Sequence, residues 1–209
     1  MGKLLLATRS KDKAREIGEI LGAGVEIVSL DDAHLSWSEA EERLEEQDTF
    51  LANARSKAAY FAKLSGLPTV ADDSGLEVVS LGGVPGARSK RFAPEAYRLS
   101  GPELDAANNA ELLRRLLGAE TARRRASYVC VAVLIRAAGA LPEVFTGRCW
   151  GHILAAPKGA NGFGYDPLFF HEGLGRTFGE VSAVEKHGVS HRGAAFRELA
   201  AALAAEPLK

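Results

Sequence analysis

The chain opens with an apolar strand that passes through a short polar turn directly into a helix. Residues 3–8 form an apolar run, and from Lys11 to Leu21 the apolar residues recur on one helical face. Ser10 suits the N-cap of this helix, and Gly22 suits its end. A second short strand is expected over residues 25–29. The first part of the chain must therefore fold as strand, tight turn, helix and strand.

Further strand and helix patterns follow along the chain. Helical periodicity predicts helices over 49–64, 102–117 and 192–203, the first of them capped by Asp48. Strands are predicted over 69–71, 76–81, 126–137 and 143–152, and the last two are expected to pair as a hairpin around Gly139. Residues 72–75 read as a turn, 31–48 as an acidic aperiodic stretch, and 155–170 as a shaped loop that runs into a short strand.

Length and charge limit the classes of protein and of partner. The 209 residues, of which 46% are hydrophobic and 25% charged, fit one domain over 1–209 that can form two lobes around a cleft. A net charge of −1 gives no overall basic field for binding a nucleic acid polymer. Any phosphate binding must therefore be local.

The amino terminus and the cysteines indicate the compartment. The first apolar run is too short for a signal peptide or a membrane helix, so a cytoplasmic protein with no membrane partner is expected. Cys130 and Cys149 lie apart and lack the spacing of zinc ligands. We expect both to be reduced and buried.

The turn from Thr8 to Lys13 is a candidate phosphate site. Unpaired N–H groups at a helix start carry positive partial charge, and here two hydroxyls and a lysine ammonium lie beside them. Many α/β proteins begin this way without binding anything, so the turn alone leaves both interpretations open. It is not a P-loop, because the GxxxxGK[ST] motif is absent.

Asp72 and Asp73 are adjacent carboxylates at the end of a buried strand. A turn beginning there would let both converge on one cation, and Mg²⁺ prefers such oxygen ligands. Simple turn chemistry in Asp-Asp-Ser-Gly is the competing interpretation. Similar ambiguity applies to the glutamates of residues 39–46, as solvated surface or metal ligand, and to Lys57, as exposed lysine or phosphate contact.

Two later segments combine groups suited to a base. Residues 162–167 place an aromatic side chain between two glycines, which suits stacking on a base but also a tight turn with Phe163 in the core. Lys186, His191 and Arg192 can each donate hydrogen bonds to an oxygen just before the last helix.

Six ordered motifs give the sequence a family resemblance. It closely resembles the inosine triphosphate pyrophosphatase family through ATRSKDKAREI, NARSKA, ADDSGLEV, LGGVPGARSKRF, GFGYDPLFF and EKHGVSHRG, in the family's order and spacing. The resemblance implies an α/β fold, with a long central mixed β-sheet flanked by helices and two lobes with an active-site cleft between them. It also implies a homodimer.

The same resemblance implies an activity. A member of this family hydrolyses non-standard purine nucleoside triphosphates (ITP, dITP and XTP) with Mg²⁺ to the nucleoside monophosphate and pyrophosphate, and so prevents their incorporation into DNA and RNA. Hypoxanthine and xanthine carry an oxygen at C6 where adenine carries an amino group. A pocket of donors would leave donor facing donor if adenine entered.

Carried onto this chain, the resemblance assigns roles to individual residues. The triphosphate would bind at Thr8, Arg9, Ser10, Lys11, Asp12 and Lys13. Lys13 and Lys57 would neutralise charge on the leaving pyrophosphate, and Asp73 would be the catalytic base. The metal acids would be Glu45 and Asp73 with Asp72 beside them. Glu45 is placed by counting back from Asn53, and Glu46 remains an alternative.

The remaining assignments concern substrate contacts. Ser74 would touch the substrate, and the residues that would enclose the base are Phe163, Gly164, Tyr165 and Asp166. Polar contacts to the base would come from Lys186, His191 and Arg192.

Two other functions stay open from the sequence. One is a related pyrophosphatase for modified pyrimidines or methylated bases, as in the Maf-like family, against which the SHRG and GFGYDP segments argue. The other is a nucleotide-binding regulator without turnover, against which the paired acids Asp72 and Asp73 and the two lysines argue.

Overall fold

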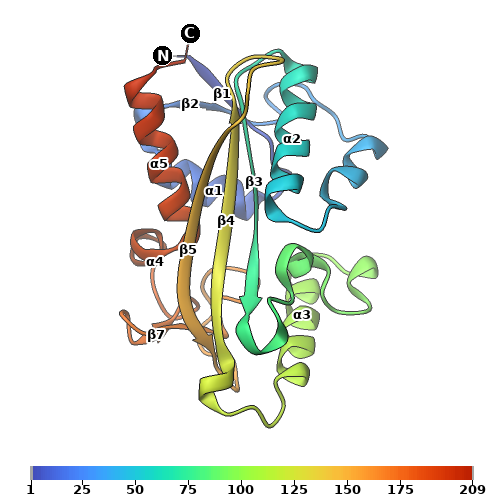
Figure 1. Ribbon diagram of the computed structural model, residues 1–209, viewed down its shortest axis with the longest axis vertical. Coiled ribbons are helices and arrows are strands. Elements are labelled where there is room, and N and C mark those ends of the chain that lie inside the picture. The colour runs from blue at the N-terminus through green and yellow to red at the C-terminus, as the bar shows by residue number, and fades with distance from the viewer. Residues whose placement is uncertain (1, 209) are drawn as a thin grey trace. The chain divides into compact units, whose positions relative to one another are not determined.

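The computed structural model describes residues 2–208 and contains a seven-stranded sheet in the order β2-β1-β3-β4-β5-β6-β7 (Figure 1). The strands are β1 Lys3–Leu6, β2 Glu26–Val28, β3 Thr69–Val78, β4 Arg125–Ile135, β5 Glu143–Ile153, β6 Phe169–His171 and β7 Arg176–Thr177. β1 pairs in parallel with β2 and β3, whereas β6 pairs antiparallel with β5 and β7. The sheet is mixed, as predicted.

Helices flank this sheet and confirm the α/β class. They are α1 Lys11–Leu21, α2 Phe50–Ser65, α3 Gly101–Arg115, α4 Ala183–Val189 and α5 His191–Ala205. Short 3₁₀ helices cover residues 22–24, 39–45, 79–81, 86–91, 96–98 and 121–124. The predicted boundaries of the longer helices and strands are confirmed to within a few residues, and β4 and β5 are sheet neighbours as the predicted hairpin requires.

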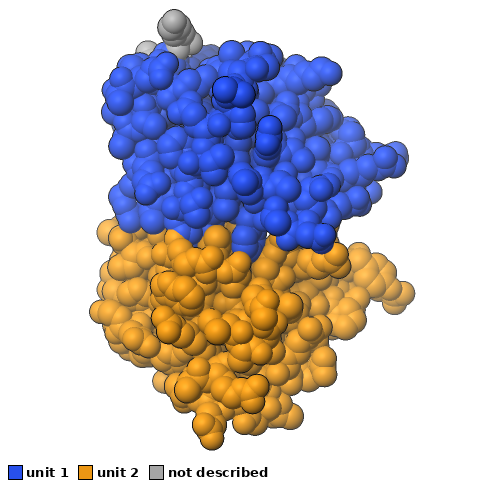
Figure 2. Space-filling model, viewed as in Figure 1, with its two compact units in different colours: residues 1–73, 130–147, 191–209 blue, residues 74–129, 148–190 orange. Residues whose placement is uncertain are grey.

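The chain divides into two compact units, drawn in different colours in Figure 2. Unit 1 comprises Met1–Asp73, Cys130–Gly147 and His191–Lys209, and unit 2 comprises Ser74–Val129 and Arg148–Ser190. Two units agree with the two predicted lobes. The predicted cleft and the single domain over 1–209 stay predictions.

Unit 1 has a core on which α1 and α5 pack together. Because alternate strand residues face opposite sides, Leu4 and Leu6 of β1 join this core from one face. Its other buried members are Ile17, Leu21, Val70, Cys130, Ala132, Leu134, Ala195, Phe196, Leu199 and Leu203. In Figure 1, α2 lies on the side of β3 away from α1 and α5. Helices therefore cover both faces of the sheet in this unit.

Unit 2 has a separate, aromatic core. The rings of Tyr128, Phe169 and Phe178 contact one another, with centroids 4.7 to 6.0 Å apart. Leu112 and Leu116, at the end of α3 and just after it, join the same cluster. The loop of residues 162–167 is anchored on this core, because Tyr165 of the loop is also a member of the cluster.

The predicted turn at residues 72–75 is wrong, because β3 continues through it without a break. Gly75 serves close packing instead of a turn: a β-carbon there would lie 2.3 Å from the Ser89 hydroxyl. Ser89 also accepts a hydrogen bond of 2.8 Å from the N–H of Leu76. Gly75 therefore lies within a strand, where its missing side chain lets the segment of Ser89 approach closely, and not in the turn that the sequence favours.

The N-caps of α1 and α2 differ in how well they match the predicted caps. Ser10 caps α1 as expected, accepting from the N–H of Lys13, but α2 is capped by Thr49 and not by Asp48. Thr49 lies at the position from which a side-chain oxygen reaches the third N–H of the helix.

Cys130 and Cys149 are both free and buried, as predicted. Within residues 2–208, no helix combines the length and apolar character needed to cross a membrane.

Candidate active site

Asp72 and Asp73 lie on opposite faces of β3. The Asp72 carboxylate lies 3.1 Å from the Lys13 ammonium of α1, whereas that of Asp73 accepts a 2.9 Å hydrogen bond from Asn53 of α2. Successive side chains of a continuous strand point in opposite directions. The two carboxylates thus contact different helices, and their joint binding of one metal ion stays a prediction.

Asp72 belongs to a buried charge network beneath the first turn of α1. Arg192, at the start of α5, lies 3.7 Å from the Asp72 carboxylate and donates a hydrogen bond to Glu16 of α1. Burial alone would raise the pKa of Asp72, but the cations of Lys13, Arg192 and Lys57 outweigh it and hold that pKa well below its usual range. Asp72 is thus an anion that fixes Lys13 at the end of the predicted phosphate turn.

Asp73 faces a second cluster, built by α2 and the acidic stretch before it. Lys57 donates from its ammonium to the Glu45 carboxylate at 2.7 Å and to the backbone oxygen of Asp72 at 2.6 Å. Burial raises the pKa of Asp73 despite the nearby ammonium groups of Lys57 and Lys13. The pKa of Lys57 is itself raised, because the carboxylates of Glu45, Asp73 and Asp72 outweigh its burial. The Lys57 ammonium therefore offsets the repulsion between the carboxylates of Glu45 and Asp73.

Side-chain hydroxyls of the predicted phosphate turn accept hydrogen bonds from the turn's own backbone. Thr8 accepts from the N–H of Ser10 at 3.2 Å, and Ser10 accepts from the N–H of Lys13 at 3.3 Å. Arg9 is engaged elsewhere, with its guanidinium bound to Glu41 at 2.8 and 3.0 Å.

Lys11 and Asp12, two further residues assigned to the turn, face outward. Lys11 is exposed at the start of α1, and Asp12 pairs with Arg15 at 2.9 Å. Lys13 is the residue of this segment that points to the acids.

The donor set around Asp73 fits a hard divalent cation. No group of three or more His, Cys, Asp and Glu side chains suited to a metal occurs among residues 2–208. Mg²⁺, however, is commonly held by one or two carboxylates together with waters and substrate phosphates. Glu45 and Asp73 share one cation, and the pKa of Asp73 is raised by burial, so a second positive charge would be favourable there.

In unit 2, the Asp166 carboxylate organises the predicted base loop. It accepts from the N–H of Phe163 at 2.9 Å, from the Lys186 ammonium at 2.5 Å and from the Tyr128 hydroxyl at 3.2 Å. Gly162 has φ +72°, and a β-carbon there would lie 2.0 Å from this carboxylate. The loop conformation therefore depends on a glycine at this position.

Lys186 and Phe163, both predicted to contact the base, lie together, and the base site itself stays a prediction. The Lys186 ammonium is 5.0 Å from the centre of the Phe163 ring. Ser74, at the start of unit 2, is half-buried on β3. His191 and Arg192 are buried and belong to unit 1, so their predicted contacts with the base stay predictions.

Sequence reasoning missed several residues around these clusters. No functional role was predicted for Asn53, although its place one helical turn before Lys57, on the same helical face, could have put it beside Asp73. Glu16, which pairs with Arg192, gave no signal because the partners are far apart in sequence. Asp105 and Asn109, which bind the backbone of Gly164, were hidden for the same reason.

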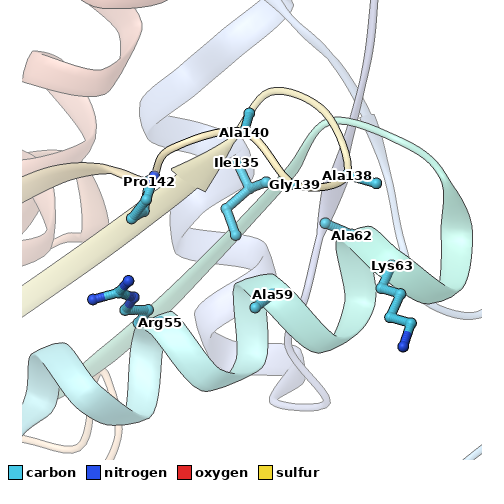
Figure 3. Close-up of a pocket in the computed structure, with 9 residues that line it drawn as sticks. All are labelled: Arg55, Ala59, Ala62, Lys63, Ile135, Ala138, Gly139, Ala140 and Pro142. Carbon is cyan, nitrogen blue, oxygen red and sulfur yellow. The ribbon is translucent and has the colours of Figure 1, made fainter.

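One pocket of the structure lies apart from all of these residues. It has a volume of about 260 Å³, and Figure 3 shows that α2 and the loop after β4 form its wall. Its lining residues are Arg55, Ala59, Ala62, Lys63, Ile135, Ala138, Gly139, Ala140 and Pro142. None of them was predicted as a site residue.

Comparison with known proteins adds a family to this geometry. Residues 4–202 match the model of the Ham1 family. The chain is 47% identical over 208 residues to a protein of Aromatoleum aromaticum named dITP/XTP pyrophosphatase, covering 99% of this chain and 98% of that protein. It is 45% identical to a Frankia alni protein of the same name, with 96% of each chain covered.

Solved structures of similar proteins have the same fold. A HAM1 protein from Coxiella burnetii superposes with a TM-score of 0.84 at 33% identity, covering 98% of this chain and 100% of that one. A nucleoside-triphosphatase (dITP/XTP pyrophosphatase) from Mycobacterium abscessus gives a TM-score of 0.72 at 41% identity, covering 96% and 98%.

Proposed function

We propose that this chain, which belongs to the Ham1 family, hydrolyses dITP, XTP and ITP to the monophosphate and pyrophosphate with Mg²⁺. It is a nucleoside triphosphate pyrophosphatase, in keeping with the names of relatives that are 47% and 45% identical over nearly its whole length. By removing these nucleotides it would prevent their incorporation into DNA and RNA.

The observation that supports the proposal best is the charge arrangement on either side of β3. Lys13 and Lys57 each lie within 3.1 Å of an acid, and both are predominantly buried. Ammonium groups held in place before substrate arrives can stabilise charge that develops on a leaving pyrophosphate without further reorganisation. A site that only binds nucleotide has less need of three acids alongside them.

Asp73 is the residue that we assign to the attacking water. Its carboxylate is mostly buried and is oriented by Asn53. It would accept a proton from water as the water oxygen attacks the α-phosphorus. The bond from the α-phosphorus to the bridging oxygen then breaks, and pyrophosphate leaves with the bond's electron pair.

Glu45 and Asp73 would hold the Mg²⁺ ion, which when bound neutralises phosphate charge. Asp72 is not retained as a metal ligand, because it faces Lys13 and Arg192. Asp72 would instead keep Lys13 aligned on the triphosphate.

For the base, Phe163 and Lys186 of unit 2 are the residues with the best support. Phe163 offers a partly exposed ring, and Lys186 is a buried donor beside it. A donor that meets the oxygen at C6 of hypoxanthine or xanthine would face the amino group of adenine without a partner. His191 and Arg192 remain candidates for the same role.

Two further parts of the proposal concern assembly and compartment. We infer a homodimer that works in the cytoplasm on small nucleotide substrates. Sedimentation equilibrium of the purified chain tests the dimer, and a single monomeric species would contradict it.

A substrate panel tests the activity. Pyrophosphate release is measured from dITP, XTP, ITP, ATP and GTP, each with Mg²⁺ and with EDTA. The proposal expects release from the first three, little from ATP and GTP, and none with EDTA. Release from modified pyrimidine triphosphates alone would favour the Maf-like alternative, and no release from any triphosphate would favour a binding role.

A further inference from the structure

The loop of residues 162–166 contains no helix or strand, and side-chain hydrogen bonds from Asp166 within the loop and from α3 outside it hold its backbone. Gly162 and Gly164 both have positive φ values, +72° and +64°. Phe163, the ring assigned above to the base, lies between them. The orientation of the Phe163 ring therefore depends on the contacts that fix the backbone of Gly162 and Gly164.

One anchor is the Asp166 carboxylate, which holds the N–H of Phe163 itself. The other anchor comes from α3 and acts on the next residue. Asp105 accepts from the N–H of Gly164 at 2.7 Å, and Asn109 donates to the carbonyl oxygen of Gly164 at 3.0 Å. Both polar groups of one peptide residue are thus bound by side chains one helical turn apart.

The chemistry of this clamp is directional. A carboxylate can only accept and an amide NH₂ can donate, so Asp105 and Asn109 match the N–H and the C=O of Gly164 in one orientation. The Asp105 bond has an ionised acceptor, which makes it stronger than a neutral hydrogen bond. Tyr165 adds a third restraint by donating from its hydroxyl to the backbone oxygen of Ser89 at 2.8 Å.

We propose that Asp105 and Asn109 of α3 are positioning residues that set the affinity for the purine base by fixing Gly164 and, through it, the Phe163 ring. This inference deepens the proposed function and rests on it. Neither residue contacts the reacting phosphate in this account. Their loss should therefore weaken binding of the base while leaving the phosphate machinery intact.

The test compares Asp105→Ala, Asp105→Asn and the control Glu103→Ala, an exposed carboxylate on the same helix. Three quantities are measured: KM and kcat for dITP, the inhibition constant of tripolyphosphate, which has no base, and the dissociation constant of dIMP by calorimetry. Asp105→Ala is expected to raise KM for dITP and the dIMP constant roughly tenfold, as loss of a charge-assisted hydrogen bond would. It should leave kcat and tripolyphosphate inhibition within about twofold of wild type.

The conservative variant sharpens the result. Asp105→Asn keeps an oxygen that can accept from Gly164, so it should recover most of the lost affinity, while Glu103→Ala should behave as wild type. Asn109→Asp, which replaces the donor by an acceptor facing the Gly164 oxygen, should weaken dIMP binding as Asp105→Ala does.

Several outcomes would overturn the inference. One is unchanged dIMP binding in Asp105→Ala, and another is an equal rise of the tripolyphosphate constant, which would indicate general damage to the fold. Failure of the proposed function is a separate outcome: wild-type protein would then release no pyrophosphate from dITP, while the dIMP titrations would still measure the effect of the clamp.

Discussion

The ammonium of Lys57 lies 2.7 Å from the carboxylate of Glu45, and the neighbouring Glu46 is exposed. Glu45 is the last residue of the 3₁₀ helix over 39–45, which α2 contacts, so its side chain is directed at the cluster around Asp73. This contact favours Glu45 over Glu46 as the metal acid.

Glu45→Gln should therefore raise the Mg²⁺ concentration needed for half-maximal activity by at least about tenfold, since a charged oxygen ligand is lost. The matched control Glu46→Gln should stay within about twofold of wild type. A larger effect in Glu46→Gln than in Glu45→Gln would reverse the assignment. The measurement is a Mg²⁺ titration of pyrophosphate release at saturating dITP.

Asp73→Asn should abolish most turnover while nucleotide still binds. The asparagine oxygen can still accept from Asn53, so the fold is kept, but it cannot take a proton from water. Turnover and dITP binding are measured separately. Turnover close to wild type would remove Asp73 from the mechanism.

The same variant should unfold at a higher temperature in EDTA at neutral pH. Burial raises the pKa of Asp73 in the folded state, so the folded protein binds more protons than the unfolded chain between the ordinary and the raised pKa. Stability contributed by this group therefore falls as pH rises through that window, and a neutral side chain removes the loss. A lower midpoint of thermal unfolding for Asp73→Asn would contradict this account.

Asp72→Asn should destabilise the protein by about 3 kcal/mol at neutral pH, because it leaves the buried cations of Lys13 and Arg192 without their shared anion. The folded pKa of Asp72 is depressed, so its contribution is present above the ordinary pKa and is lost as pH falls through the depressed value. Urea unfolding at pH 7 and in acid should show the difference from wild type shrinking in acid. Asp12→Asn, which breaks the exposed pair with Arg15, should cost less than about 1 kcal/mol. Equal costs for the two variants would show that the buried network has no special role.

Gly162→Ala and Gly164→Ala should differ in their cost. Both place a side chain at positive φ, which costs about 1–2 kcal/mol. Only at Gly162 would the new β-carbon meet the Asp166 carboxylate, at 2.0 Å, whereas at Gly164 it meets no described atom within 4 Å apart from those of its two chain neighbours. Urea unfolding should therefore show the larger loss of stability for Gly162→Ala. The reverse order would mean that Asp166 does not sit tightly against the loop.

The sequence could predict those parts of the fold that depend on local patterns. Helix α1, its Ser10 cap and the long strands β4 and β5 follow from periodicity and capping chemistry. The continuity of β3 could not be predicted, because Gly75 is locally a turn residue, whereas in the structure it allows Ser89, a residue distant in sequence, to pack closely against the strand.

The site divides in the same way. The residue types and the family motifs indicated Lys13, Lys57 and Asp73, but not that Asp72 turns away from Asp73, which follows from the unbroken strand. The hydrogen bonds from Asp105 and Asn109 of α3 to Gly164 could not be predicted either, since they join residues far apart in the chain.

The most direct test of the central claim is hydrolysis of dITP in water labelled with ¹⁸O, followed by mass spectrometry of the products. Attack of water on the α-phosphorus predicts one labelled oxygen in dIMP and none in pyrophosphate. Label in pyrophosphate, or in inorganic phosphate released beside dIDP, would place the attack on another phosphorus and would contradict the mechanism.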